Sequence, residues 1–139
     1  MKVFLDRVHQ SEKDIQRATV DAIERTALFR ALIINPGLKP FRGKWIVSQA
    51  TAGVPDICVL APGGRTIWFE VKTPIGRLNK AQVRTIEKIR KAGHPVYVVH
   101  FAREALGYLK AIADEWNLID KVLDAMVAGV CKIKLKEAK

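Results

Sequence analysis

The sequence predicts an α/β domain in which a small mixed β-sheet is flanked by helices. Apolar residues recur at helical spacing in several stretches, and short runs of β-branched and aromatic residues lie between them. Along the chain the elements alternate as helix, strands, helix, strand and helices, which is the order of helices packed on a sheet. The chain has 139 residues, 49% of them hydrophobic, and this suits one core. We therefore expect a single domain over residues 1–139.

The first predicted element is a helix over about residues 10–33. Ser11 is a favourable N-cap, because its side chain can accept from a free backbone N–H of the first turn. Pro36 and Gly37 end the helix, since proline disfavours helical geometry at the residue before it. The apolar residues at helical spacing are Ile15, Ala18, Ala22 and Ile23.

Four strands are predicted in the middle of the chain. Residues 44–49 form the first, and the largely apolar run at 56–60 forms a short buried strand. Residues 62–64 (Pro-Gly-Gly) are a hairpin signal, and residues 66–72, rich in β-branched and aromatic side chains, form the returning strand. The apolar run at 96–99 forms the fourth.

Three more helices complete the predicted domain. Residues 79–92 form the first, with Asn79 as its N-cap and Gly93 just past its end. Residues 102–115 and 117–128 form the others.

The C-terminal end of the chain has an apolar stripe on the predicted helix 117–128, which either completes the core or forms a homodimer surface. The residues of this stripe are Leu118, Val122, Leu123, Ala125 and Met126. The tail, residues 130–139, alternates apolar and basic residues, which is typical of a short edge strand or of a segment that orders late.

The charge of the chain is concentrated in its centre. The formal net charge is +10, and residues 30–91 hold twelve basic side chains against three acidic ones. Residues 1–29 are neutral overall and residues 92–139 have a net charge of +1. A membrane anchor would more often be a contiguous basic run or one helix face. The pattern therefore favours a nucleic acid as partner.

Several classes of protein are excluded or disfavoured. No apolar run is long enough to span a membrane, and Asp6 and Arg7 interrupt the stretch that a signal peptide would need. Cys58 and Cys131 are the only cysteines and form no zinc motif, which suits a reducing cytoplasm. The three histidines lack metal-ligand spacing, and we expect them to be structural; they are His9, His94 and His100.

Two carboxylates and a lysine are predicted to converge at the open end of the hairpin. If the loop is residues 62–64, Asp56 lies opposite Glu70, and Lys72 points to the same face as Glu70. Two facing carboxylates are destabilising unless a cation lies between them. A two-residue loop would instead put Asp56 opposite Val71 and on the other face.

This set of side chains has a specific chemical use. Hydrolysis of a phosphodiester needs a cation that neutralises phosphate oxygens and lowers the pKa of an attacking water. Mg²⁺ is commonly held by one or two carboxylates together with waters and substrate phosphate. A nearby lysine orients the water, stabilises developing charge, or acts as base if its pKa is depressed.

The same residues resemble a known family. The segments that carry the resemblance are Gly53-Val54-Pro55-Asp56, Trp68-Phe69-Glu70-Val71-Lys72, Gly76-Arg77-Leu78 and Gln82. They resemble the PD-(D/E)xK nuclease superfamily and, more narrowly, the VRR-NUC domain, the virus-type replication-repair nuclease. The resemblance covers about residues 11–109.

The resemblance implies a restriction-endonuclease-like fold and a Mg²⁺ or Mn²⁺ cofactor. Asp56 and Glu70 would be metal ligands, the Val71 carbonyl would complete the metal sphere, and Lys72 would be the catalytic lysine. Gln82 would lie at the site from the following helix. Glu12 matches an acidic position of the first helix that often joins the site as a ligand, although it also suits the positive end of the helix dipole.

The implied function is that of a metal-dependent endodeoxyribonuclease in the cytoplasm of a bacterial or phage-infected cell. Stand-alone members of the family suggest branched, flapped or four-way junction DNA, handled by a homodimer. A non-catalytic nucleic-acid-binding module and a nuclease acting on RNA are the alternatives. The candidate phosphate-binding residues are Arg42, Lys44, Arg77, Lys80 and Arg84.

Overall fold

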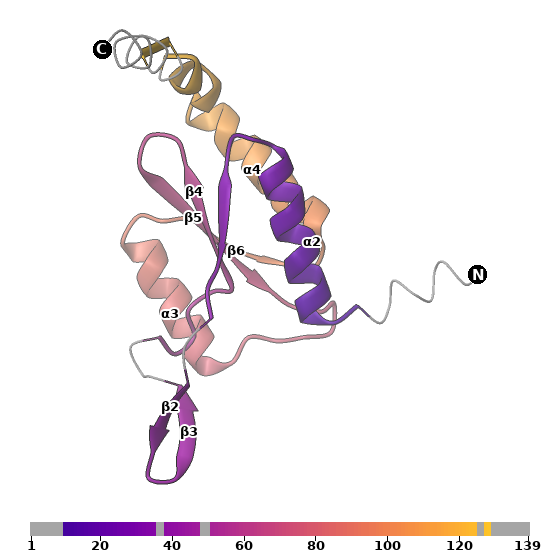
Figure 1. Cartoon of the computed structure of the whole chain (residues 1–139), viewed down its shortest axis with the longest axis vertical. Helices are drawn as coiled ribbons and strands as arrows, with labels where there is room; N and C mark the ends of the chain where they lie inside the picture. The colour runs from indigo at the N-terminus through magenta and orange to yellow at the C-terminus, as the bar shows by residue number, and fades with distance from the viewer. Residues whose placement is uncertain (1–9, 36–37, 48–50, 125–126, 129–139) are drawn as a thin grey trace, which may run out of the picture.

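The computed structural model describes residues 10–35, 38–47, 51–124 and 127–128. In chain order the elements are α2 (Glu12–Arg25), β1 (Arg30–Ile33), β2 (Leu38–Phe41), β3 (Lys44–Val47), β4 (Ile57–Ala61), β5 (Arg65–Val71), α3 (Lys80–Lys91), β6 (Val96–Val99) and α4 (Ala102–Glu115) (Figure 1). The predicted strands at 56–60, 66–72 and 96–99 and the predicted helices at 79–92 and 102–115 are confirmed, most of them with ends shifted by one residue.

The predicted helix over residues 10–33 is wrong in its second half. It begins as expected, with Ser11 and Asp14 forming a capping box, but α2 ends at Arg25. Ala27 has a φ of 57°, a left-handed conformation that no helix continues through. Residues 30–33 then pair with β4 as a strand, and the β-branched Ile33 suits a strand better than a helix.

A separate two-stranded ribbon precedes the main sheet. β2 and β3 pair only with each other, and β2 was not predicted. The predicted strand 44–49 is confirmed over Lys44–Val47, and its last two residues lie outside the described part of the chain. Arg42 and Gly43 form the two-residue turn with φ of 47° and 73°, as the tightest hairpin turns require. The ribbon extends away from the main sheet (Figure 1).

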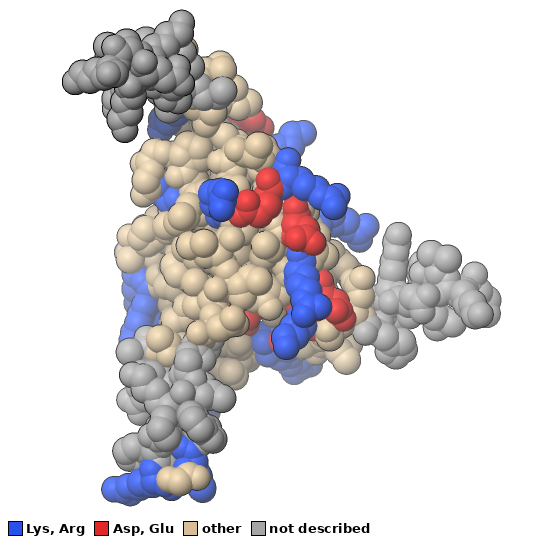
Figure 2. Space-filling view, in the orientation of Figure 1, with Lys and Arg blue, Asp and Glu red and all other residues tan. Residues whose placement is uncertain are grey.

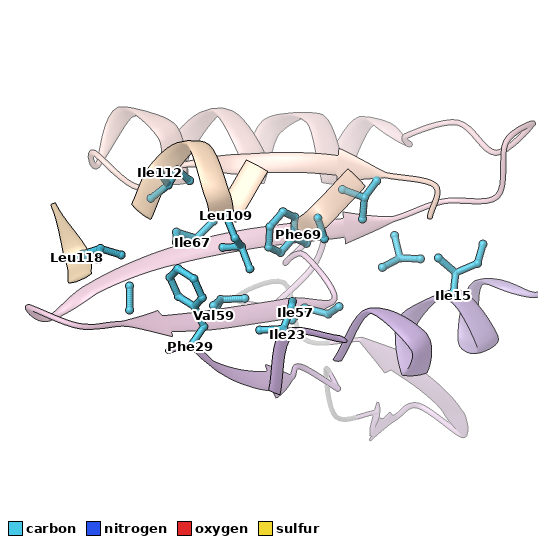
Figure 3. Packing of buried hydrophobic residues seen from close by; sticks show 14 residues of the cluster. Ile15, Ile23, Phe29, Ile57, Val59, Ile67, Phe69, Leu109, Ile112 and Leu118 are labelled. Atoms are coloured by element: carbon cyan, nitrogen blue, oxygen red, sulfur yellow. The ribbon is translucent and has the colours of Figure 1, made fainter. Parts of the chain in front are cut away.

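The main sheet has the order β1-β4-β5-β6 and is mixed, as predicted. β1, β4 and β5 are antiparallel neighbours, whereas β5 and β6 are parallel and are joined through α3. Alternate side chains of β4 and β5 enter the core together with residues of α2 and α4 (Figure 3). The buried residues of this face include Ile23, Ile57, Val59, Ile67, Phe69, Val71 and Leu109. Glu70, on the opposite face of β5, contacts Gln82 of α3.

The register of the β4–β5 hairpin agrees with the three-residue loop. Ile57 lies opposite Phe69 and Ala61 opposite Arg65, so residues 62–64 form the loop. The same register places Asp56, one residue before β4, opposite Glu70 on the face that α3 covers. The alternative two-residue loop, with Asp56 opposite Val71, is thereby excluded.

The chain continues beyond α4 as a further helical segment. Residues 118–124 are helical, and Leu118 is buried in the core, so part of the predicted stripe completes that core. Leu123 is 55% exposed, while Ala125, Met126 and the predicted tail strand at 130–139 lie outside the described residues. Within the part of the chain that the structure describes, no helix is long and apolar enough to cross a membrane.

Candidate active site

Asp56 directly precedes β4 and contacts residues of α2 and β5 and the residue that follows β1. Its Oδ2 accepts a hydrogen bond from the Val71 backbone N–H at 2.8 Å, which extends the β4–β5 pairing by a side chain. Its own carbonyl accepts from the Ile34 N–H at 2.8 Å and from Gln16 Nε2 at 3.5 Å. Burial raises the pKa of Asp56, and the Val71 hydrogen bond and the charge of Lys72 only partly oppose this shift.

Glu70 is the most deeply buried acid of the site, with 1% of its surface exposed. Its Oε1 accepts from Gln82 Nε2 at 2.5 Å and lies 3.2 Å from Lys72 Nζ. Its Oε2 is buried without a hydrogen-bond partner among the described residues. Burial and the neighbouring charge of Asp56 raise the pKa of Glu70 to about 7. A buried oxygen of this kind is costly unless a ligand occupies it.

Lys72 is the only described cation in direct contact with these acids. Its Nζ lies 3.2 Å from Glu70 Oε1 and 3.5 Å from Glu12 Oε1. Burial of Lys72 opposes its charge, but the charges of Glu70, Glu12 and Asp56 outweigh burial and raise the pKa of the amine. Lys72 is therefore cationic at neutral pH.

The orientation of Gln82 is set by the first turn of α3. The Asn79 side chain accepts from the Gln82 backbone N–H, and Gln82 Oε1 accepts from the Asn79 backbone N–H, both at 2.9 Å. Because this capping box occupies Oε1, only the amide nitrogen of Gln82 is left to face Glu70. Gln82 therefore closes the helix end and holds one oxygen of the buried acid.

The structure brings Glu12, Asp56, Glu70, Lys72 and Gln82 together through the contacts described above. Glu12, from the first turn of α2, contacts Lys72. Among the described residues, no group of three or more His, Cys, Asp and Glu side chains is arranged to hold a metal ion. Asp56 and Glu70 thus form a carboxylate pair, and the role of Glu12 as a ligand stays a prediction.

The residues present fit a cation of the magnesium type. Two acids converge, Oε2 of Glu70 is buried with no hydrogen-bond partner from the residues that the structure describes, and Mg²⁺ needs only one or two carboxylates with waters and substrate phosphate. The Val71 carbonyl is the predicted backbone ligand. Burial is the main cause of the raised pKa of both acids; the charge of Asp56 adds to it at Glu70, and the charge of Glu12 adds to it at Asp56.

The predicted phosphate-binding residues are exposed and lie in two places. Arg42 and Lys44 are at the turn of the β2–β3 ribbon, and Figure 2 shows basic side chains gathered at its far end. Arg77 precedes α3 in the chain. Lys80 and Arg84, at the start of α3, line a pocket of about 380 Å³ together with Leu78, Asn79 and Val83.

Two residues at the site were not predicted from the sequence. Gln16 lies one helical turn after Glu12 and contacts the Asp56 carbonyl. His100 follows β6, and its Nδ1 lies 3.1 Å from the Lys72 carbonyl and 3.2 Å from the Thr73 carbonyl, so this nitrogen carries the proton. The position of His100 directly after β6 could have indicated this, because the parallel strands β5 and β6 end at the same edge of the sheet and Lys72 directly follows β5.

Comparison with known proteins agrees with this geometry. Residues 10–102 match the VRR-NUC domain family. A solved structure described as a VRR_NUC domain is similar in fold, with a TM-score of 0.52 and 22% sequence identity, over 71% of this chain and 94% of that chain. No curated protein matches the sequence. The main sheet, its flanking helices and the family match together establish a restriction-endonuclease-like fold, and the chain belongs to the VRR-NUC family of nuclease domains.

Proposed function

We propose that the protein is a Mg²⁺- or Mn²⁺-dependent endodeoxyribonuclease of the PD-(D/E)xK type. The observation that carries this proposal is the buried Glu70 Oε2, which has no hydrogen-bond partner in the described part of the chain and lies beside a second acid and a lysine. A structural carboxylate would be paired on both oxygens or exposed to water.

Each residue of the site has a separate part in the proposed reaction. Asp56, Glu70 and the Val71 carbonyl would hold the cation, which when bound would supply charge neutralisation at the phosphate and a more acidic attacking water. Gln82 and Lys72 hold Oε1 of Glu70 and so direct Oε2 towards the cation. Lys72, as a cation, stabilises negative charge that develops on the phosphate and orients the water.

Basic residues around α3 would hold the DNA backbone. Arg77 and Lys80 are exposed and adjoin the helix end that carries Gln82. We expect Arg77→Ala and Lys80→Ala each to weaken DNA binding for all sequences alike, because phosphate contacts carry no sequence information.

The salt dependence of binding measures these contacts. Each variant should lower the slope of log K against log salt by about one, measured by fluorescence anisotropy without divalent cations. Lys110→Ala, an exposed lysine of α4, is the matched control and should leave the slope unchanged. Equal slopes for all four proteins would contradict the assignment.

We further propose that the substrate is branched, flapped or four-way junction DNA and that the protein acts as a homodimer. The described residues form the nuclease fold, the β2–β3 ribbon and a short helical segment beyond α4. Beyond α4, an apolar stripe of Ile119, Leu123 and Val127 is exposed at one-turn intervals, and two such stripes would bury each other across a two-fold axis.

The proposed function is tested by cleavage of a substrate panel. Duplex, single strand, flap and four-way junction, each as DNA and as RNA, are incubated with Mg²⁺, Mn²⁺ or EDTA. We expect cleavage of DNA only with a divalent cation, and faster cleavage of junction or flap than of linear duplex. Binding without cleavage in any cation would instead identify an accessory module, and preferred cleavage of RNA would reassign the substrate. A monomer that cuts linear duplex as fast as junctions would overturn the branched-DNA proposal.

A further inference from the structure

The loop before Asp56 contacts the backbone of α3 at a position where no side chain fits. Gly53 has a φ of 75°. A Cβ atom built on Gly53 would lie 2.4 Å from the Ala81 carbonyl carbon and 2.6 Å from the Gln82 backbone nitrogen, and nearer still to the Ala81 carbonyl oxygen. All three neighbours are backbone atoms of the first helical turn, so they cannot move away without moving α3.

A hydrogen bond beside this contact fixes the same two segments together. Thr85 Oγ1, one turn further along α3, donates to the Ala52 carbonyl at 2.8 Å. Within the loop, the Val54 N–H donates to the Thr51 carbonyl, which turns the chain towards Pro55 and Asp56. The loop that leads to one metal-binding acid is therefore packed against the helix turn that holds the other.

We propose that Gly53 is a positioning residue for the active site. Its missing side chain lets α3 approach until Gln82 Nε2 reaches Glu70 Oε1, and this leaves Oε2 of Glu70 to the cation. The capping box with Asn79 fixes which end of the Gln82 amide faces Glu70, and the contact at Gly53 fixes its distance. The inference rests on the proposed function, in which Glu70 holds the cation.

The chain offers a matched control for Gly53. Gly64, in the β4–β5 loop, has a φ of 77°, but a Cβ atom built there meets nothing within 4 Å. Gly53→Ala and Gly64→Ala therefore impose the same left-handed strain on the backbone, and only Gly53→Ala also displaces α3. A difference in behaviour between the two variants therefore reports the close contact of Gly53 with the backbone of α3, and not a general loss of stability.

Two measurements on the full chain test the proposal. Mn²⁺ affinity is measured by titration calorimetry, and the side-chain amide signals of Gln82 are followed by ¹⁵N NMR without any cation. We expect Gly53→Ala to weaken Mn²⁺ binding by about 10- to 100-fold and to shift the Gln82 amide signals, because groups that orient a metal ligand typically contribute this much. Gly64→Ala should change neither.

A wild-type Mn²⁺ affinity together with unshifted Gln82 signals in Gly53→Ala would overturn the proposal. If Gly53→Ala does not fold, the proposal is tested with Thr85→Val, which removes only the hydrogen bond to Ala52. This variant should bind Mn²⁺ several-fold more weakly than the wild type. An unchanged Mn²⁺ affinity of Thr85→Val would overturn the proposal. If the wild type binds no Mn²⁺, the proposed function fails, whereas the Gln82 signals of the variants still report whether Gly53 sets the position of α3.

Discussion

Replacing Lys72 by methionine is expected to lower kcat for DNA cleavage by about 10³-fold while DNA affinity changes little. Methionine keeps the length and packing of the buried stem but removes the charge 3.2 Å from Glu70. Under the proposed mechanism the transition state then loses the cation that stabilises the phosphate, and the water loses the group that orients it. The exposed basic residues proposed to bind DNA are untouched.

Single-turnover cleavage and DNA binding of Lys72→Met are compared with those of two other variants. Lys110→Met, an exposed position on α4, should cleave at the wild-type rate. Lys72→Arg should not restore activity, because the larger planar guanidinium does not fit a buried point-charge position. Cleavage by Lys72→Met at the wild-type rate would show that Lys72 is not the catalytic lysine.

Replacing Glu70 by glutamine is expected to stabilise the cation-free protein at pH 8 and to abolish its stabilisation by Mg²⁺. The pKa of Glu70 is raised to about 7 in the folded protein, mainly by burial, from an ordinary value of 4.5. The folded state thus binds this proton more tightly than the unfolded state. The free energy of unfolding should therefore fall as the pH rises from about 4.5 to about 7, by up to about 3 kcal/mol from this group.

Glutamine removes this loss because it is never charged. In the wild type, Mg²⁺ binding to the folded state alone should recover stability, and more at pH 8 than at pH 5, where the acid is protonated. Melting temperatures of the wild type and of Glu70→Gln at pH 5 and pH 8, each with and without Mg²⁺, give all of these comparisons.

Glu87→Gln is the matched control for this experiment, since Glu87 is an exposed carboxylate of α3. It should retain both the fall in stability with pH and the response to Mg²⁺. A cation-free Glu70→Gln protein that melts below the wild type at pH 8 would mean that the ion pair with Lys72 outweighs the burial of Glu70.

The expected effects of the Lys72 and Glu70 variants are related, because the two oxygens of Glu70 have different surroundings. Oε1 is held by Lys72 and Gln82, while Oε2 has no hydrogen-bond partner within the described ranges of the chain. In the proposed function Lys72 therefore has two parts, in catalysis and in the orientation of the acid. Loss of Lys72 should thus also weaken Mn²⁺ binding, whereas loss of Arg77 or Lys80 should not.

Much of the fold and of the site followed from local rules. The three-residue loop at 62–64 determined the register of the β4–β5 hairpin, and that register placed Asp56 opposite Glu70. Asn79 and Ser11 marked the helix starts, since capping depends on residues only three apart in the chain. The motif residues carried the family, and the family match over residues 10–102 confirmed it.

Other features depended on contacts between segments far apart in the sequence. Residues 30–33 have an apolar pattern that suits either a helix or a strand, and pairing with β4 decided for the strand. His100 and Gln16 reach the site only because β6 lies parallel to β5 and α2 packs near Asp56. No local pattern of the sequence contains these distances.

The sequence by itself determined which residues carry charge and where the chain turns, and it limited Asp56 to two positions, opposite Glu70 or opposite Val71. Spacing along one hairpin suffices for that, because side-chain alternation is a local property, and the observed register then placed Asp56 opposite Glu70. Only the tertiary structure decided how deeply those acids are buried and which hydrogen bonds they make. How deeply Glu70 is buried, which of its oxygens stays without a partner and why residue 53 has no room for a side chain all depend on the approach of α3. Burial and electrostatic coupling depend on distances through space, and packing of the whole core sets these distances.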